Sequence, residues 1–215
     1  MDRLHTVRAT WAPALALGLA GALMAGGCDR RGDEKREPPA SGDRVNAVEA
    51  GPEKNEKKVS ADEFCDVRAK QASAAPALTL PALAGGQSPP GKGSWRWFNV
   101  WATWCKPCIE EMPQLSKWRA DMAAQGVRFD LVFLSADESD EIVARFRERH
   151  PDAPPSLRLA DPDSLPKWFS AIGLGESAPI PVHVFVDPDD RVRCVRAGGV
   201  KEKDLSAVRA IFGAS

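Results

Sequence analysis

A pair of cysteines placed directly after an apolar segment constrains this chain more than any other feature. The segment Trp97-Phe98-Asn99-Val100 leads into the run Trp101-Ala-Thr-Trp-Cys105-Lys-Pro-Cys108. This order is typical of a buried strand that feeds a Cys-x-x-Cys pair at the start of a helix. Because a helix N-terminus stabilises an anion, a thiolate on Cys105 would face unpaired N–H groups and the positive end of the dipole. The second thiol, Cys108, can then resolve a mixed disulfide, which indicates thiol–disulfide exchange.

The apolar runs and turn residues around this pair predict alternating strands and helices. A capping box from Ser60 to Glu63 begins the first helix, Gly126 ends the helix of the cysteines, and Asp187-Pro-Asp-Asp190 forms a hairpin turn. We expect helices over 61–71, 105–125, 140–149, 164–172 and 202–212, and strands over 77–83, 94–101, 128–135, 157–159, 181–186 and 191–196. Pro113 lies inside the second of these helices and is expected to kink it. Such an order of elements predicts a three-layer α/β sandwich.

The cysteine motif and a distant proline-led segment together resemble the thioredoxin superfamily, and more closely its membrane-tethered TlpA/ResA/CcmG-type branch. The likeness rests on Asn99, the run from Trp101 to Cys108, Glu111, Pro113 and the segment Ile180-Pro-Val-His-Val-Phe-Val-Asp187. It covers roughly residues 59 to 215. The resemblance implies a thioredoxin-like three-layer α/β/α sandwich with a mixed central sheet and an N-terminal extension. It also implies a disulfide oxidoreductase that needs no cofactor.

The resemblance assigns roles to residues of the motif. Cys105 would attack a client disulfide and Cys108 would resolve the mixed disulfide. Thioredoxin itself carries a buried Asp where this chain has Asn99, and in the TlpA/ResA-like branch a Glu is implicated instead. That residue is Glu111, one helical turn after Cys108, where its carboxylate could relay a proton. The alternative is that Glu111 is a solvated helix residue beside Glu110.

A docking surface for the client is expected around the cysteines. Thioredoxin-like proteins place a cis proline where this chain has Pro181, so that the backbone of Ile180 can pair with an extended client segment. A trans proline at a strand edge is the alternative. We expect Trp104, Lys106 and Pro107 to complete this surface.

The other aromatic side chains and His183 are interpreted as structural. Tryptophans at alternating strand positions and on helices usually fill a core, and four are expected there: Trp97, Trp101, Trp118 and Trp168. His183 follows Pro181 on a strand and is expected to be a buried histidine whose hydrogen bonds are satisfied.

The N-terminal residues are typical of an export signal followed by a tether. Residues 1–27 carry two early arginines and then a small, apolar run. The sequence Leu23-Met-Ala-Gly-Gly-Cys28 resembles a bacterial lipobox, which would lipidate Cys28; a cleaved signal or an uncleaved anchor is the alternative. Residues 28–58 are charged and poor in apolar side chains, as in a flexible tether. Each alternative places the domain over 59–215 outside the cytoplasm, and the lipobox predicts a membrane-anchored lipoprotein on the periplasmic side.

Two further cysteines, Cys65 and Cys194, are left over from the five in the chain. In an exported protein such a pair is expected to form a structural disulfide, here between the first predicted helix and a late strand. Two separate buried thiols are the alternative, because free cysteine packs as a small hydrophobe.

Charge and ligand spacing argue against other function classes. A formal net charge of −1 over 215 residues does not suit a nucleic-acid binder. A zinc site needs four ligands, and the three histidines stand apart in the sequence, so no metal is expected. A copper metallochaperone and a thioredoxin-fold peroxidase stay open as alternatives, although the chain lacks the Cys-x-x-x-Cys spacing of the first and the Pro-x-x-x-Thr/Ser-x-x-Cys run of the second.

The resulting hypothesis is a membrane-anchored reductase of disulfides in extracytoplasmic client proteins. The family implies clients such as the apoproteins of cytochrome c maturation. It also implies re-reduction by a membrane electron donor of the CcdA/DsbD type. The sequence itself names no client and leaves the direction of electron flow open, because that direction depends on relative potentials.

Overall fold

A six-stranded mixed sheet forms the middle layer of the protein in the computed structural model, which describes residues 58–213. The predicted signal segment 1–27, Cys28 and all but the last residue of the predicted tether lie outside the described residues. The strand order is β1-β6-β5-β2-β3-β4. The strands are β1 (Val67–Arg68), β2 (Trp95–Trp101), β3 (Phe129–Ser135), β4 (Ser156–Arg158), β5 (Val182–Val186) and β6 (Val192–Ala197). β2, β3 and β4 run parallel, whereas β5, β6 and β1 pair antiparallel.

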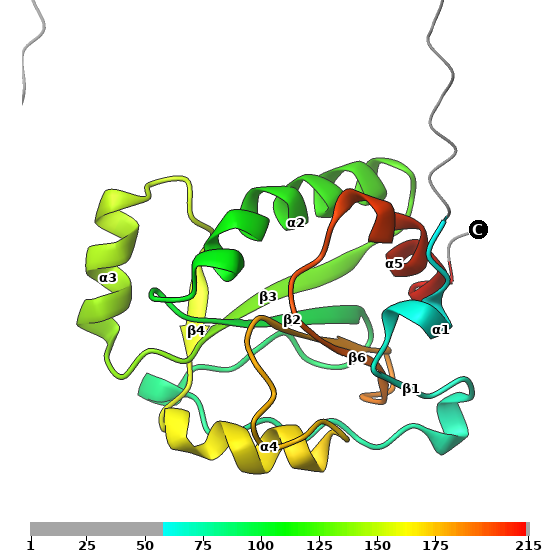
Figure 1. Cartoon of the computed structure of the whole chain (residues 1–215), viewed down its shortest axis with the longest axis horizontal. Helices are drawn as coiled ribbons and strands as arrows, with labels where there is room; N and C mark the ends of the chain where they lie inside the picture. Colours follow the sequence, from blue (N-terminus) through cyan, green and yellow to red (C-terminus); the bar gives the residue numbers. More distant parts are fainter. Residues whose placement is uncertain (1–57, 214–215) are drawn as a thin grey trace, which may run out of the picture. The chain divides into compact units, whose positions relative to one another are not determined.

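Helices cover both faces of this sheet, which confirms the predicted three-layer α/β/α sandwich (Figure 1). The helices are α1 (Ala61–Phe64), α2 (Lys106–Ala124), α3 (Asp140–Arg149), α4 (Leu165–Ala171) and α5 (Leu205–Ile211). One core cluster joins the sheet to α1, α2, α3 and α5, and a second joins it to α4. Among residues 58–213, the helices are too short or too polar to cross a bilayer.

Strand β2 is the central element and positions the cysteines. Both of its faces are covered, so nearly all of its residues are buried, as is usual for a strand with parallel pairing. Because side chains alternate along a strand, Trp97 and Trp101 pack in the core under α2, whereas Phe98 and Val100 pack in the core over α4. The chain leaves the end of β2 and enters α2 at Cys105, which is the N-cap of that helix.

The predicted first helix over 61–71 is wrong in length. The capping box of Ser60 and Glu63 is present, but the helix ends at Phe64. Cys65 is already extended, and the following residues pair as β1 with β6. A disulfide to Cys194, with Cα atoms 5.5 Å apart, ties Cys65 to β6 at this point. Pairing and cross-link together therefore replace the continued helix that the local sequence favours.

Three other expected elements also differ from the structure. The expected strand over 77–83 is present only as isolated bridges, from Ala77 to Arg191 and from Leu83 to Leu159. Pro81 has no N–H to donate, which explains why no continuous ladder forms there. The expected helices over 164–172 and 202–212 each begin with a short 3₁₀ turn, Pro162–Ser164 and Glu202–Asp204, before α4 and α5.

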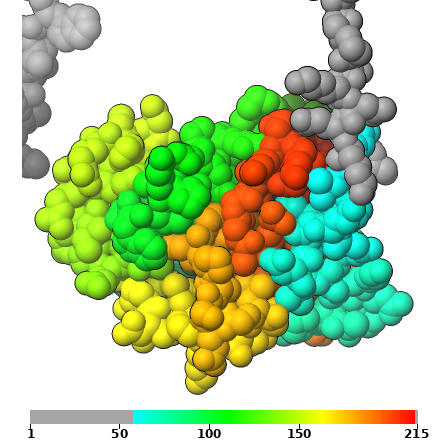
Figure 2. All heavy atoms as spheres, in the orientation of Figure 1, coloured from blue at the N-terminus to red at the C-terminus, as the bar shows by residue number. Residues whose placement is uncertain are grey.

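The first described residues pack beside the C-terminal part of the chain (Figure 2). Phe64 of α1 is fully buried and meets the ring of Phe185 edge to face. The hydroxyl of Ser206 donates to the carbonyl of Val59 at 3.0 Å. The Cys65–Cys194 disulfide therefore links the N-terminal extension to β6, and the packing of Phe64 holds the extension in the same place.

Candidate active site

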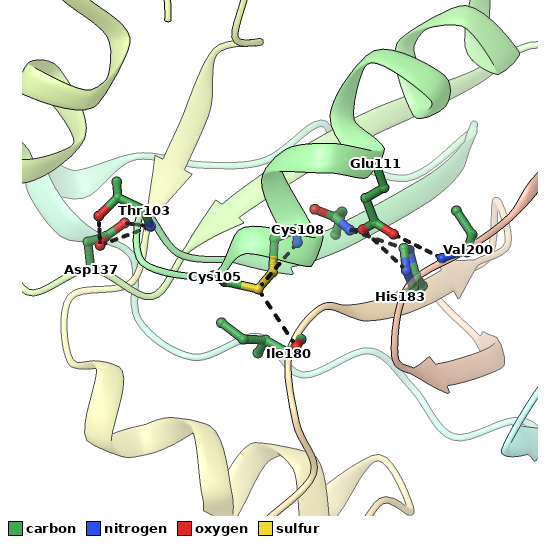
Figure 3. The surroundings of a disulfide bond; sticks show 9 residues. Thr103, Cys105, Cys108, Glu111, Asp137, Ile180, His183 and Val200 are labelled. Carbon is green, nitrogen blue, oxygen red and sulfur yellow. Dashed lines mark hydrogen bonds and ion pairs between the residues drawn. A yellow bond between two sulfur atoms is a disulfide. The ribbon is translucent and has the colours of Figure 1, made fainter. Parts of the chain in front are cut away.

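The two motif cysteines form a disulfide at the N-terminus of α2 (Figure 3). Cys105 is 5% exposed, and Cys108, one turn inside the helix, is fully buried. The backbone N–H of Cys108 points at Sγ of Cys105 across 3.3 Å. In the reduced protein this N–H and the helix dipole would stabilise a thiolate on Cys105, because both favour negative charge at that position.

The loop before β5 faces this disulfide. The Ile180–Pro181 peptide bond is cis, as the resemblance implies. The carbonyl oxygen of Ile180 lies 3.7 Å from Sγ of Cys105. The carbonyl of Pro181 accepts the N–H of Gly198 at 2.8 Å. The site therefore combines the start of α2 with the start of β5, which are about 75 residues apart in sequence.

Glu111 is buried, so the alternative of a solvated helix residue is wrong for its side chain. It is 4% exposed, whereas Glu110 is exposed and pairs with Lys106. The amide of Asn99 donates to Oε1 of Glu111 at 2.8 Å, and the N–H of Val200 donates to Oε2 at 3.0 Å. A carboxylate can accept several N–H groups in this way because both of its oxygens are acceptors. Asn99, which stands where thioredoxin carries a buried Asp, therefore contacts the carboxylate of Glu111.

His183 belongs to the same buried cluster, which the sequence interpretation missed. Its Nε2 atom lies 3.5 Å from Oε1 of Glu111 and has no hydrogen-bond partner of good geometry, so the expectation of a fully satisfied histidine is wrong. The signal that could have found it is the pairing of β2 with β5, which sets His183 opposite Asn99. Residues directly opposite in a sheet share a face.

Asp137 is a second functional candidate that the sequence interpretation did not single out. It is 2% exposed and follows β3 at the same edge of the sheet where β2 ends. Its carboxylate accepts the N–H of Thr103 at 3.0 Å, the hydroxyl of Thr103 at 2.7 Å and the hydroxyl of Ser135 at 2.7 Å. These bonds hold the loop that leads into Cys105 (Figure 3).

A groove of about 450 Å³ lies beside the disulfide. Its walls are mainly apolar, and Trp104, Phe169 and Ile180 contribute to them. Trp104 is 71% exposed, which is unusual for a large apolar side chain within residues 58–213. Lys106 and Pro107 are exposed at the start of α2. The expected docking residues therefore surround Cys105, although Lys106 and Pro107 do not line the groove itself.

The expected core tryptophans are buried: Trp97, Trp101, Trp118 and Trp168. Across residues 58–213, no three His, Cys, Asp or Glu side chains gather as a set of metal ligands.

Comparisons with known proteins identify a family and several similar proteins. The family model described as Redoxin matches residues 70–211. The chain is 32% identical over 101 residues to the thiol-disulfide oxidoreductase ResA of Bacillus thuringiensis (strain Al Hakam), which covers 47% of this chain and 53% of that protein. It is 33% identical over 87 residues to the thioredoxin-like protein YneN of Bacillus subtilis (strain 168), covering 40% of this chain and 51% of that protein. The chain thus spans about half the length of the curated relatives it matches.

A solved structure is also similar. The thioredoxin domain of a thiol-disulfide oxidoreductase from Bacteroides vulgatus shares 21% identity with this chain at a TM-score of 0.48, covering 66% of this chain and 96% of that one. The likeness to ResA agrees with the branch that the cysteine motif indicates. Because the Redoxin model covers nearly all of the described residues, this chain belongs to the Redoxin family.

Proposed function

We propose that this protein is an extracytoplasmic thiol-disulfide oxidoreductase that reduces disulfides in client proteins. The observation that carries the proposal is the Cys105–Cys108 disulfide at the N-terminus of α2, with a backbone N–H aimed at Sγ of Cys105. The relatives named thiol-disulfide oxidoreductase ResA support the same reaction class.

The reaction proceeds in two exchanges. The thiolate of Cys105 attacks one sulfur of the client disulfide, and the other client sulfur leaves as a thiolate that takes a proton from solvent. The thiol of Cys108 then loses its proton, and its sulfur attacks Sγ of Cys105. The mixed disulfide breaks, the Cys105–Cys108 disulfide forms and the second client thiolate leaves and is protonated. Two electrons have passed from the enzyme to the client.

Glu111 is the proposed proton acceptor in the second exchange. Cys108 is fully buried, so its thiol has no direct access to bulk solvent. Glu111 lies one helical turn further along α2 and is itself buried. A carboxylate at that position can take the proton as the thiolate forms, which is general base catalysis.

The groove and the cis-proline loop are the proposed docking site for the client. The exposed Trp104 and the apolar wall formed with Phe169 and Ile180 suit an unfolded client segment, which exposes apolar side chains. The backbone at Ile180 can pair with an extended segment, while Lys106 and Pro107 border the attacking cysteine.

The cellular setting is proposed from the sequence features outside the described residues. The lipobox-like segment ending at Cys28 suggests a lipid anchor, and the tether that follows gives the domain reach from the membrane. The Cys65–Cys194 disulfide supports an oxidising compartment, where structural disulfides persist. Apocytochromes c as clients, and a CcdA/DsbD-type membrane donor that re-reduces the pair, follow from the resemblance alone.

Trapping of the mixed disulfide tests this proposal. Cys108→Ser should accumulate a covalent adduct with a disulfide-bearing protein, because the resolving thiol is gone. Cys105→Ser should form none, because Cys108 is buried. Absence of the adduct in Cys108→Ser, together with tight copper retention by the reduced wild-type protein, would contradict the oxidoreductase and favour a metallochaperone.

A further inference from the structure

A buried polar cluster lies behind the redox disulfide and joins three elements of the fold. Asn99 comes from β2, Glu111 from α2 and His183 from β5, and all three are at most 4% exposed. Figure 3 shows the side chains of Glu111 and His183 directed toward each other. Trp97 of β2 completes the cluster by donating its indole N–H to Nδ1 of His183 at 3.2 Å. Buried polar groups of this kind are costly unless they are paired, so their arrangement carries information about what the cluster does.

The contacts of His183 determine which of its ring nitrogens carries hydrogen. The indole nitrogen of Trp97 is a donor only. The amide nitrogen of Asn99 lies 3.4 Å from the same Nδ1 atom while it donates to Glu111. Two N–H groups therefore face Nδ1, which must accept, and the single hydrogen of the neutral ring sits on Nε2. A second proton on Nδ1 would face those two donors and would find no acceptor there.

In this tautomer the N–H at Nε2 of His183 is directed toward the carboxylate of Glu111. Nε2 lies 3.5 Å from Oε1 of Glu111, which is longer than a normal hydrogen bond. It is a buried polar atom with no other partner. Catalytic hydrogen bonds are often long in the resting enzyme and shorten in the reacting complex. Together with Asn99 and Val200, His183 thus surrounds the carboxylate with N–H groups.

The charged and titratable neighbours of His183 are few. α2 contributes Glu111, with Cys108 one turn before it. β6 contributes Arg196, which is opposite His183 in the sheet, but its guanidinium donates to the carbonyl of Phe64 at 2.9 Å and lies over the Phe64 ring. β2 contributes only the neutral side chains of Trp97 and Asn99. Glu111 is therefore the titratable group whose state His183 can influence most directly.

We propose that His183 is a positioning residue that, as a neutral imidazole with its hydrogen on Nε2, holds the Glu111 carboxylate ready to accept the proton of Cys108. This inference rests on the proposed oxidoreductase function and adds to it a residue that the cysteine motif does not contain. In the step concerned, the S–H bond of Cys108 breaks and the proton passes to Glu111. The sulfur electron pair then forms the bond to Sγ of Cys105, and the client thiolate leaves. His183 exchanges no proton and no electron in this step.

The test compares two substitutions in the full chain. His183→Leu removes the N–H, whereas His183→Gln keeps an amide N–H that can reach the carboxylate. Val184→Ala is the matched control, because it is on the same strand, is equally buried and packs in the core on the opposite face of the sheet. The decay of a preformed mixed disulfide between Cys105 and a model peptide is followed by rapid quench between pH 5 and 9.

His183→Leu should slow this decay roughly tenfold at pH 7, and the midpoint of its pH profile should move upward by about one unit, because one N–H that favours the carboxylate is lost. His183→Gln should recover most of the rate, and Val184→Ala should keep the wild-type midpoint. The first exchange, attack by Cys105, should be unchanged in all three. A wild-type midpoint in His183→Leu, or equal slowing of both exchanges, would overturn the positioning role.

A spectroscopic readout on the unaltered protein needs no variant to fold. Nitrogen chemical shifts of the His183 ring should report a neutral imidazole with its hydrogen on Nε2 at pH 7. A hydrogen on Nδ1, or a charged ring, would overturn the inference while leaving the oxidoreductase intact. If instead the wild-type protein formed no mixed disulfide at all, the proposed function would fail and the inference with it.

Discussion

Removal of the Cys65–Cys194 disulfide should strongly destabilise the fold. The two cysteines are separated by 129 positions in the sequence. In the chain-entropy model, closing a loop of that length restricts the unfolded chain by about 5 kcal/mol at 25 °C. The folded chain keeps other contacts at this point, because Phe64 remains buried and Arg196 still donates to its carbonyl. We therefore expect Cys65→Ala/Cys194→Ala to lower the free energy of unfolding by about 3–5 kcal/mol.

Urea denaturation followed by tryptophan fluorescence under oxidising conditions measures this loss. The dependence of the free energy on urea should also become steeper, because the unfolded chain without the cross-link exposes more surface. Cys105→Ser/Cys108→Ser is the control: it opens a loop of only three positions, for which the same model gives about 2 kcal/mol. Disulfide exchange should survive in Cys65→Ala/Cys194→Ala, since these residues are not at the site.

An unchanged urea midpoint and slope in Cys65→Ala/Cys194→Ala would refute this reasoning. Such a result would mean that contacts between α1 and α5 persist in the unfolded chain and already restrict it, or that the cross-link is absent from the protein in solution. A loss of exchange activity in a variant that is still folded would refute the purely structural role.

Three further perturbations test separate parts of the structure. Burial raises the pKa of Asp190, but its bonds to Arg96 and Lys92 outweigh that effect and hold the pKa below 3.8. These bonds therefore stabilise the fold at a pH above the pKa of Asp190 in the unfolded chain. The stabilisation is lost as the pH falls through the pKa of Asp190 in the folded protein. Asparagine tolerates the positive φ of 61° at this position. Asp190→Asn should lower the free energy of unfolding, measured by urea denaturation, by about 2 kcal/mol at pH 7 and by clearly less at pH 3. Equal losses at the two pH values would contradict the ion pair. Trp104→Ala should lower kcat/KM about tenfold for a protein disulfide and leave a small disulfide such as oxidised glutathione unaffected; equal losses would contradict client docking. Asp137→Ala should cost about 1–3 kcal/mol in thermal unfolding, because the half-buried donors of Thr103 and the buried hydroxyl of Ser135 lose their acceptor. Glu138→Ala, at an exposed neighbour, should cost almost nothing, and similar costs of the two substitutions would contradict the loop anchor.

The elements nearest to the cysteines could be predicted because their signals are local. A mostly apolar segment, interrupted by Arg96 and Asn99, marks β2, and the cysteine pair followed by Gly126 marks the start and the end of α2. Predicted and observed bounds of α3 coincide at Asp140–Arg149, where Ser139 caps the first turn and Pro151 follows the last. In these segments propensity, capping and burial favour the same structure.

The remaining features depend on contacts between distant parts of the chain. Residues 65–71 favour a helix locally, but pairing with β6 and the cross-link to Cys194 stabilise an extended chain. The roles of His183 and Asp137 follow only from strand pairing, since β2 next to β5 brings His183 to Asn99, and β2 next to β3 brings Asp137 to Thr103. These contacts cannot be predicted from the sequence alone, because they depend on which strands are neighbours in the sheet.

The reduction potential of the Cys105–Cys108 pair tests the central claim most directly. The protein is equilibrated with glutathione or dithiothreitol redox buffers, free thiols are alkylated, and the two cysteines are followed by peptide mapping. A reversible two-electron transition near or below the potential of thioredoxin, about −270 mV, is the result that the reductase account predicts. A potential near that of DsbA, about −120 mV, would contradict it and indicate an oxidant, and the absence of any reversible transition would contradict disulfide exchange itself.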